Sequence, residues 1–260
     1  MIESRLESFF PSEFSLLLGI GFLLLAVAEI GYRMGKSVPR KDDTAFLSEI
    51  SGYQSAVLGL LALLLGFTFS MALNHYDLRR KLVIEEANSI GTTYLRTSLL
   101  PGAARNISQN LLRDYVNLRI TQDTEASDKI GNLKQIAVIQ SELWKQAEIA
   151  ANIAPNAITV SYITSLNETI DLASTQLATS RFRVPGVLWL ILLVVSLFGI
   201  WASGFSSGVN RKRALFLTVG LPVLITLVLL MITDISSPSR GLIRTDYSSM
   251  TELRDSMNRP

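Results

Sequence analysis

The sequence predicts an all-α, polytopic membrane protein with four transmembrane helices in two hairpins and an extramembrane helical bundle inserted between them. Three observations lead to this fold class: four long apolar runs, their pairing at the two ends of the chain, and a polar middle with helical periodicity. Each run reaches or approaches the roughly 20 residues with which an α-helix crosses about 30 Å of hydrocarbon. The runs are Phe14 to Tyr32, Ala56 to Leu73, Val187 to Ser203 and Ala214 to Thr233.

The first two runs are expected to form a transmembrane hairpin over residues 14–74. The segment between them contains Gly35, Pro39 and the charged run Arg40 to Asp43, which is typical of a polar turn. The residues before the first run carry more acidic than basic side chains, unlike an export signal, so we interpret this run as a retained span. Because no proline or glycine separates Leu73 from Leu82, we expect the second helix to continue out of the bilayer without a break.

Residues 75–183 are expected to form an extramembrane bundle of about four amphipathic helices. Apolar residues recur at spacings of three and four, as in Ile107, Leu111 and Tyr115. Helix breaks are indicated at Pro101-Gly102, in the polar stretch 122–128, and at Pro155. Alternating patterns typical of strands are missing.

The last two runs are expected to form a second transmembrane hairpin over residues 184–234. Gly204 to Arg213 supplies the turn, and Pro222 should kink the fourth span because it removes a backbone donor. The polar tail, residues 235–260, is expected to be extended and either to dock on the bundle or to fray.

Composition excludes several classes of protein. The net charge of +2 comes from 24 basic and 22 acidic residues spread along the chain, which is unlike the concentrated basic surface of a nucleic-acid binder. With no cysteine and one histidine, one subunit cannot form a disulfide, a reactive thiol or a zinc site of cysteine and histidine ligands. Because no nucleophile elbow, phosphate-binding loop or zinc-helix motif is present, we expect neither an enzyme nor a cofactor.

A stripe of small or polar side chains follows one face of the second span, at every fourth residue. Small residues at this spacing permit close helix packing, which is the simpler interpretation. The alternative is a pore lining, in which Phe67 or Phe69 forms an apolar gate. The stripe consists of Ala62, Gly66, Ser70 and Asn74.

Charges of both signs follow this span immediately. They form either a solvated helix face with pairs such as Lys81 with Glu85, or the vestibule of an oligomeric pore. The set is Asp77, Arg79, Arg80, Lys81, Glu85 and Glu86. Elsewhere, Glu29 is expected to pair with Arg33, and Arg96 and Arg113 to bind helix ends or one another.

The stretch Gly59 to Pro101 and the tail around Asp234, Pro238 and Gly241 resemble the bestrophin-like domain family of bacterial membrane proteins. The family is distantly similar to bestrophins, which are oligomeric anion channels with a helical cytosolic domain and a second span that lines the pore. The resemblance therefore implies a multi-pass protein of the bacterial inner membrane with a cytoplasmic bundle. Where the family's tail has a basic and an aromatic residue around the proline, this chain has Ser237 and Ser239.

The side of the membrane that the bundle faces stays open at this stage. Lys and Arg in the two hairpin loops favour cytoplasmic loops and hence a bundle on the other side, in conflict with the resemblance. Basic residues such as Arg80 and Arg183 flank the spans on the bundle side as well.

The leading hypothesis is an oligomeric ion channel, anion-conducting by the resemblance, with the second span around the axis. The alternative is a non-conducting membrane scaffold or sensor whose bundle binds a partner or ligand. The partners expected for the channel are the lipid bilayer, small ions and further copies of the chain, without nucleic acid.

Overall fold

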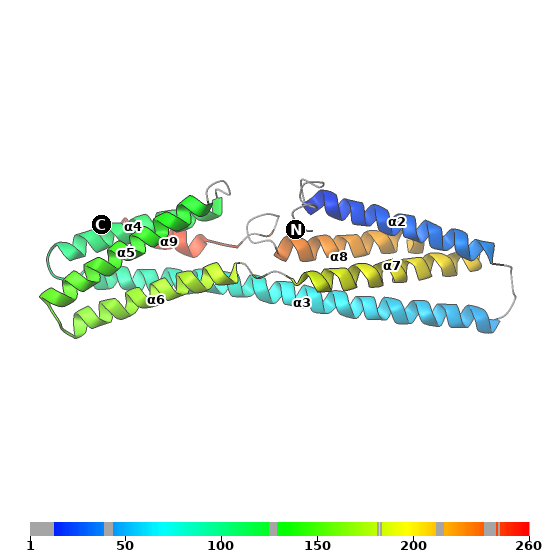
Figure 1. The fold of residues 1–260 in the computed structure, drawn as a ribbon, viewed down its shortest axis with the longest axis horizontal. Coiled ribbons are helices and arrows are strands. Elements are labelled where there is room, and N and C mark those ends of the chain that lie inside the picture. Colours follow the sequence, from blue (N-terminus) through cyan, green and yellow to red (C-terminus); the bar gives the residue numbers. More distant parts are fainter. Residues whose placement is uncertain are drawn as a thin grey trace. The chain divides into compact units, whose positions relative to one another are not determined.

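The computed structural model describes residues 13–38, 44–124, 129–180, 182, 184–211, 216–236, 243 and 245–259. Regular structure in these residues is entirely helical (Figure 1). The chain divides into two compact units. The first unit comprises Met1–Asn74 and Arg183–Ser237, and the second comprises His75–Phe182 and Pro238–Pro260.

Long helices form the first unit. They are α2 (Glu13–Ser37), the first part of α3 (Thr44–Thr97), α7 (Gly186–Val209), the π-helix η2 (Phe216–Gly220) and α8 (Leu221–Ser236). The second unit contains the rest of α3 together with α4 (Ala103–Thr124), α5 (Lys129–Ile153), α6 (Ala157–Thr179) and α9 (Ser248–Met257).

Four stretches in the described part of the chain are long and apolar enough to cross a membrane. They are Leu17–Ser37, Ser48–Thr97, Gly186–Val209 and Thr218–Ser236, and each overlaps one of the four apolar runs. The expected continuation of the second span is confirmed, because α3 is a single helix of 54 residues.

Close packing in the first unit depends on glycines that face each other across α2 and α7. A Cβ atom on Gly35 would collide with the carbonyl oxygen of Phe205, and one on Gly204 would collide with that of Ala28. Gly31 and Gly208 are equally restricted. Each helix thus carries a GxxxG motif, Gly31 to Gly35 and Gly204 to Gly208, which lets the two backbones touch.

The same contacts give the direction of the two helices. Gly31 lies against Trp201 and Gly35 lies against Phe205, so residue numbers rise together along α2 and α7. The first and third spans are therefore parallel.

The disturbance expected at Pro222 takes the form of a π-helical turn. Residues Phe216–Gly220 are π-helical, and the α-helix α8 begins at Leu221, one residue before the proline. A π-turn widens the backbone locally, which accommodates a residue that cannot donate to the helix ladder. Thr226 donates from its hydroxyl to the carbonyl oxygen of Pro222 at 2.8 Å.

Helix boundaries in the second unit follow local signals. Gly102 adopts a φ of +61° directly after Pro101 and separates α3 from α4. Asn156 caps α6, because its side-chain oxygen accepts hydrogen bonds from the backbone N–H of Ile158 and of Thr159. The hydrophobic core includes the fully buried Leu112, Leu143 and Leu166.

The tail docks on the bundle, which was one of the two expected outcomes, but part of it is helical and not extended as predicted. Residues Ser248–Met257 form α9, and Met250 and Met257 are buried in the core of the second unit. Asp246 starts this helix by accepting hydrogen bonds from the backbone N–H and the hydroxyl of Ser248. The tail is polar on average, but its two methionines, seven residues apart, share one face of the helix.

Replacement of Gly204 by alanine should destabilise the first unit by about 1–3 kcal/mol, because the added methyl group meets a backbone carbonyl that cannot move aside. The matched control is Gly59→Ala on α3, where an added Cβ has no neighbour within 4 Å. Thermal unfolding in detergent measures both. Equal losses for the two variants would contradict a role for close packing.

Candidate functional site

The small-residue stripe on α3 is uncovered in the chain. Ala62, Gly66, Ser70 and Asn74 are all exposed, and a Cβ built on Gly66 has no neighbour within 4 Å. Beside the stripe, Phe67 is 65% exposed and Phe69 is half-buried. Among the residues that the structure describes, none covers the stripe, in contrast to the glycines of α2 and α7.

The charges that follow the span separate into two groups. Asp77, Arg80 and Lys81 are exposed, and Lys81 lies 3.6 Å from the half-buried carboxylate of Glu85. Arg79 and Glu86 are buried. Because the side chains of Arg79 and Glu86 are shielded from solvent within the subunit, neither is a vestibule charge, which corrects the sequence interpretation for both residues.

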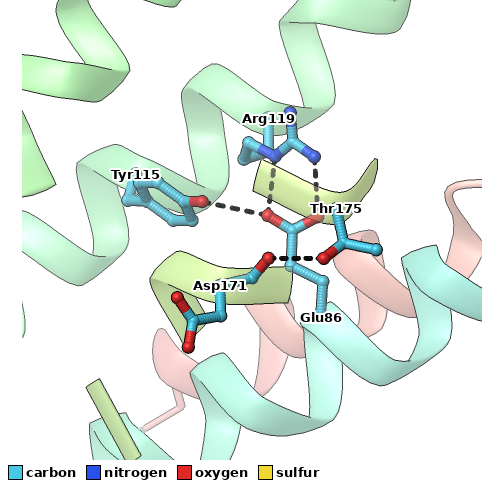
Figure 2. Close-up of polar contacts among 5 residues, drawn as sticks. All are labelled: Glu86, Tyr115, Arg119, Asp171 and Thr175. Atoms are coloured by element: carbon cyan, nitrogen blue, oxygen red, sulfur yellow. Dashed lines mark hydrogen bonds and ion pairs between the residues drawn. The ribbon is translucent and has the colours of Figure 1, made fainter. Parts of the chain in front are cut away.

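Glu86 instead forms a buried ion pair with Arg119 of α4 (Figure 2). Arg119 donates from Nε to Glu86 Oε1 at 2.8 Å and from its terminal nitrogen to Oε2 at 2.6 Å, so both carboxylate oxygens are engaged. The hydroxyl of Tyr115 donates to Oε1 at 3.0 Å. A two-pronged guanidinium–carboxylate pair with a third donor satisfies the charges that burial has removed from water.

Burial and charge shift the pKa values of both partners of Glu86. Burial raises the pKa of Tyr115, and the negative charge of Glu86 raises it further. Burial alone would lower the pKa of Arg119, but Glu86, Tyr115 and Tyr247 outweigh it and the pKa is raised. The guanidinium therefore stays protonated and the phenol neutral throughout the physiological range.

This cluster was not predicted from the sequence. Glu86 was expected among solvated or vestibule charges, and Tyr115 only as one apolar position in a periodic helix. The partner of Glu86 lies 33 residues further along, on another helix. The available signal was the spacing of Tyr115 and Arg119, which share one face of α4 at i and i+4.

A second set of polar contacts, made by hydroxyl groups, joins α3 to α6. Ser89 and Thr93 of α3 both reach the hydroxyl of Thr169, at 2.9 and 3.1 Å. Within α6, Thr175 donates to the carbonyl oxygen of Asp171, one helical turn earlier (Figure 2). In the second unit α3 is thus held by directional bonds in addition to apolar packing.

Two expectations about arginine and glutamate pairs are confirmed. Arg113 donates to the carbonyl oxygen of Met257 at the end of α9, where a cation also complements the helix dipole. Arg33 donates to Glu29 at 2.9 Å, one helical turn away. The expectation that Arg96 binds a helix end was wrong. Its guanidinium donates to the carbonyl oxygen of Ser161, within the first turns of α6 and not at the C-terminal end of that helix.

The four apolar helices define a multi-pass membrane protein of the all-α class. A model of the bestrophin-like domain matches residues 21–250 of the chain, nearly its whole length. The chain therefore belongs to the bestrophin-like domain family. No curated protein and no solved structure matches it.

Replacement of Glu86 by alanine should destabilise the protein by about 3–5 kcal/mol, because it leaves the buried guanidinium of Arg119 without its counter-charge. The matched control is Glu85→Ala, one residue away, whose exposed pair with Lys81 is worth at most about 1 kcal/mol. Denaturant unfolding in detergent measures the difference. The double variant Glu86→Met with Arg119→Met should be milder than Glu86→Ala, since neither charge then remains buried.

Tyr115 should make stability fall at alkaline pH. Its pKa is raised in the folded state, so its contribution is complete below the ordinary tyrosine pKa of about 10 and is lost as the pH rises above that value. Unfolding free energies measured from pH 8 to pH 11 should fall more steeply for the parent chain than for Tyr115→Phe. Equal slopes of unfolding free energy against pH for the two proteins would show that the fold does not raise the pKa of the Tyr115 phenol.

Proposed function

We propose that the chain is the subunit of a homo-oligomeric ion channel in which α3 lines the pore. The observation that carries the proposal is the uncovered stripe of α3. In the same unit, α2 and α7 bury their glycines against each other, whereas a Cβ atom on Gly66 would have no neighbour within 4 Å and Ala62, Ser70 and Asn74 are exposed. Small side chains on a membrane helix leave room either for water and ions or for a second copy.

Membership of the bestrophin-like family supports the channel class, and the likeness to bestrophins favours anions as the permeating ions. Phe67, exposed beside the stripe, is the proposed apolar gate, with Phe69 as its neighbour. Beyond the span, Asp77, Arg80 and Lys81 are exposed and are the proposed vestibule charges. Rotational symmetry would repeat each of them around the axis.

The proposed topology is two hairpins, α2 with α3 and α7 with α8, with the bundle of residues 75–183 between them. The parallel course of α2 and α7 supports it, because the first and third of four successive spans must run in the same direction. The proposed location is the bacterial inner membrane.

Chloride efflux from liposomes that contain the purified oligomer tests the channel. Phe67→Ala should raise the flux several-fold, because loss of the ring removes an apolar barrier to water and ions. The matched control is Phe22→Ala on α2, which removes an equally exposed ring away from α3. An unchanged flux in Phe67→Ala, or equal changes in both variants, would argue against α3 as the pore lining.

A groove on the second unit favours a second candidate function, a membrane scaffold or sensor. It has a volume of about 570 Å³ between α4 and α5, and its lining includes the apolar Leu118, Val138 and Ile139 and the charged Asp114 and Lys134. This size and lining suit a small ligand or an apolar side chain of a partner. Purified protein that conducts ions without any partner would make this function unnecessary.

A further inference from the structure

The groove between α4 and α5 carries two charged side chains of opposite sign in its lining. Asp114 of α4 and Lys134 of α5 both line the groove, and both are exposed. Among the residues that the structure describes, no ion pair joins the two, and neither is paired with another charged side chain. The carboxylate and the ammonium are therefore both available to a ligand in the groove.

Helix geometry places these two charges at different heights along the groove. The helices α4 and α5 pack against each other and are joined by the short segment 125–128, so they run in opposite directions (Figure 1). Asp114 lies ten residues before Thr124, the end of α4. Lys134 lies five residues after Lys129, the start of α5. At a rise of about 1.5 Å per residue these positions are about 15 and about 7 Å from the joined ends, so about 7 Å along the groove separates them.

The rest of the lining is apolar or carries amides. Leu118, Val138 and Ile139 supply the apolar surface, and Val138 is 61% exposed. The side chains of Asn117 and Gln135 line the groove as well, and each of their amides can both donate and accept hydrogen bonds. A ligand that matches this lining has a cationic end, an anionic end, apolar groups, and polar groups that bond to amides.

A short peptide with free termini has all of these features. An extended chain covers about 3.3–3.6 Å per residue, so two residues span about the 7 Å between the heights of Asp114 and Lys134. A single α-amino acid carries its ammonium and carboxylate on the same carbon atom, which is too close for both to reach their partners. The volume of about 570 Å³ lies within the range of about 300–1,000 Å³ that is typical of ligand pockets.

We propose that the groove between α4 and α5 binds apolar peptides of two or three residues, with the terminal ammonium at Asp114 and the terminal carboxylate at Lys134. The inference rests on the second candidate function, the membrane sensor, and names the chemical class of its ligand. Apolar side chains of the peptide cover Leu118, Val138 and Ile139, and their burial supplies affinity. The two charges select for free termini and fix the direction in which the peptide binds.

Isothermal titration calorimetry of the full chain in detergent, with the dipeptide leucyl-leucine as the probe, tests the site. Binding should be saturable. It should be about fivefold weaker for N-acetyl-leucyl-leucine and for leucyl-leucinamide, because each lacks one terminal charge and an exposed charge pair has an effect of this size.

Two variants assign each terminus to its partner. Asp114→Asn should abolish the discrimination against the acetylated peptide, and Lys134→Gln should abolish the discrimination against the amide. The matched control is Glu148→Gln, at an exposed acidic residue of α5 outside the groove, which should retain both preferences. Unchanged preferences in Asp114→Asn and Lys134→Gln would overturn the proposal.

Filling the groove tests its location without changing a charge. Val138→Trp should abolish the binding of leucyl-leucine, whereas Val160→Trp should not, because Val160 is equally exposed, at 62%, but lies on α6. The absence of saturable binding to the parent chain would overturn the proposal. Equal binding of a leucine dipeptide with both termini blocked would also overturn it, and would assign the groove to an apolar side chain of a partner protein.

Chloride efflux separates this inference from the proposed channel. Saturable binding of leucyl-leucine to a protein that conducts no chloride supports the peptide site and refutes the channel. Chloride efflux through a protein that does not bind leucyl-leucine supports the channel and refutes the peptide site.

Discussion

Backbone contact between α2 and α7 is the interaction on which the first unit depends. In lipid, apolar side chains gain little by leaving one hydrocarbon surface for another, so helices associate through close packing. Gly31 and Gly35 on one helix and Gly204 and Gly208 on the other remove the side chains that would separate the two backbones. Helix α2 also packs against α8, where Gly21 lies next to Thr226. The contacts of α2 therefore join three of the four apolar helices.

A different principle holds the second unit together. It has an apolar core, but the position of α3 in it is specified by polar groups that have partners only in one arrangement. Glu86 requires the guanidinium of Arg119 and the phenol of Tyr115, and Ser89 and Thr93 require Thr169. A shift of α3 by one helical turn would leave the buried carboxylate without its partners, at a cost far above that of losing an apolar contact.

Small residues therefore have two uses in this chain. On α2 and α7 they allow the two helices to pack inside the subunit. On α3 they are exposed, as the proposed pore lining requires. Helix α3 is a single helix that contributes residues to both units.

Much of the fold could be predicted because its signals are local. An apolar run of about twenty residues, a proline after a helix, and the lack of any breaker between Leu73 and Leu82 act through neighbours in the sequence. The four apolar helices and the unbroken course of α3 follow from them, although α3 begins at Thr44 and not at the start of its apolar run, Ala56. Family membership likewise follows from residue patterns along the chain. The exposed face of α3 was foreseen as a stripe, but not whether the chain itself would cover it.

Only the tertiary structure decided which residues meet. The glycines of α2 and α7 are more than 160 residues apart, Glu86 finds Arg119 on another helix, and the polar tail forms α9 because two methionines enter a core built from distant segments. A pattern of residues determines which face of a helix is apolar, small or charged. Which neighbour covers that face depends on the packing of the whole chain, and the charge of a side chain such as Glu86 does not reveal whether it ends in water or in the core.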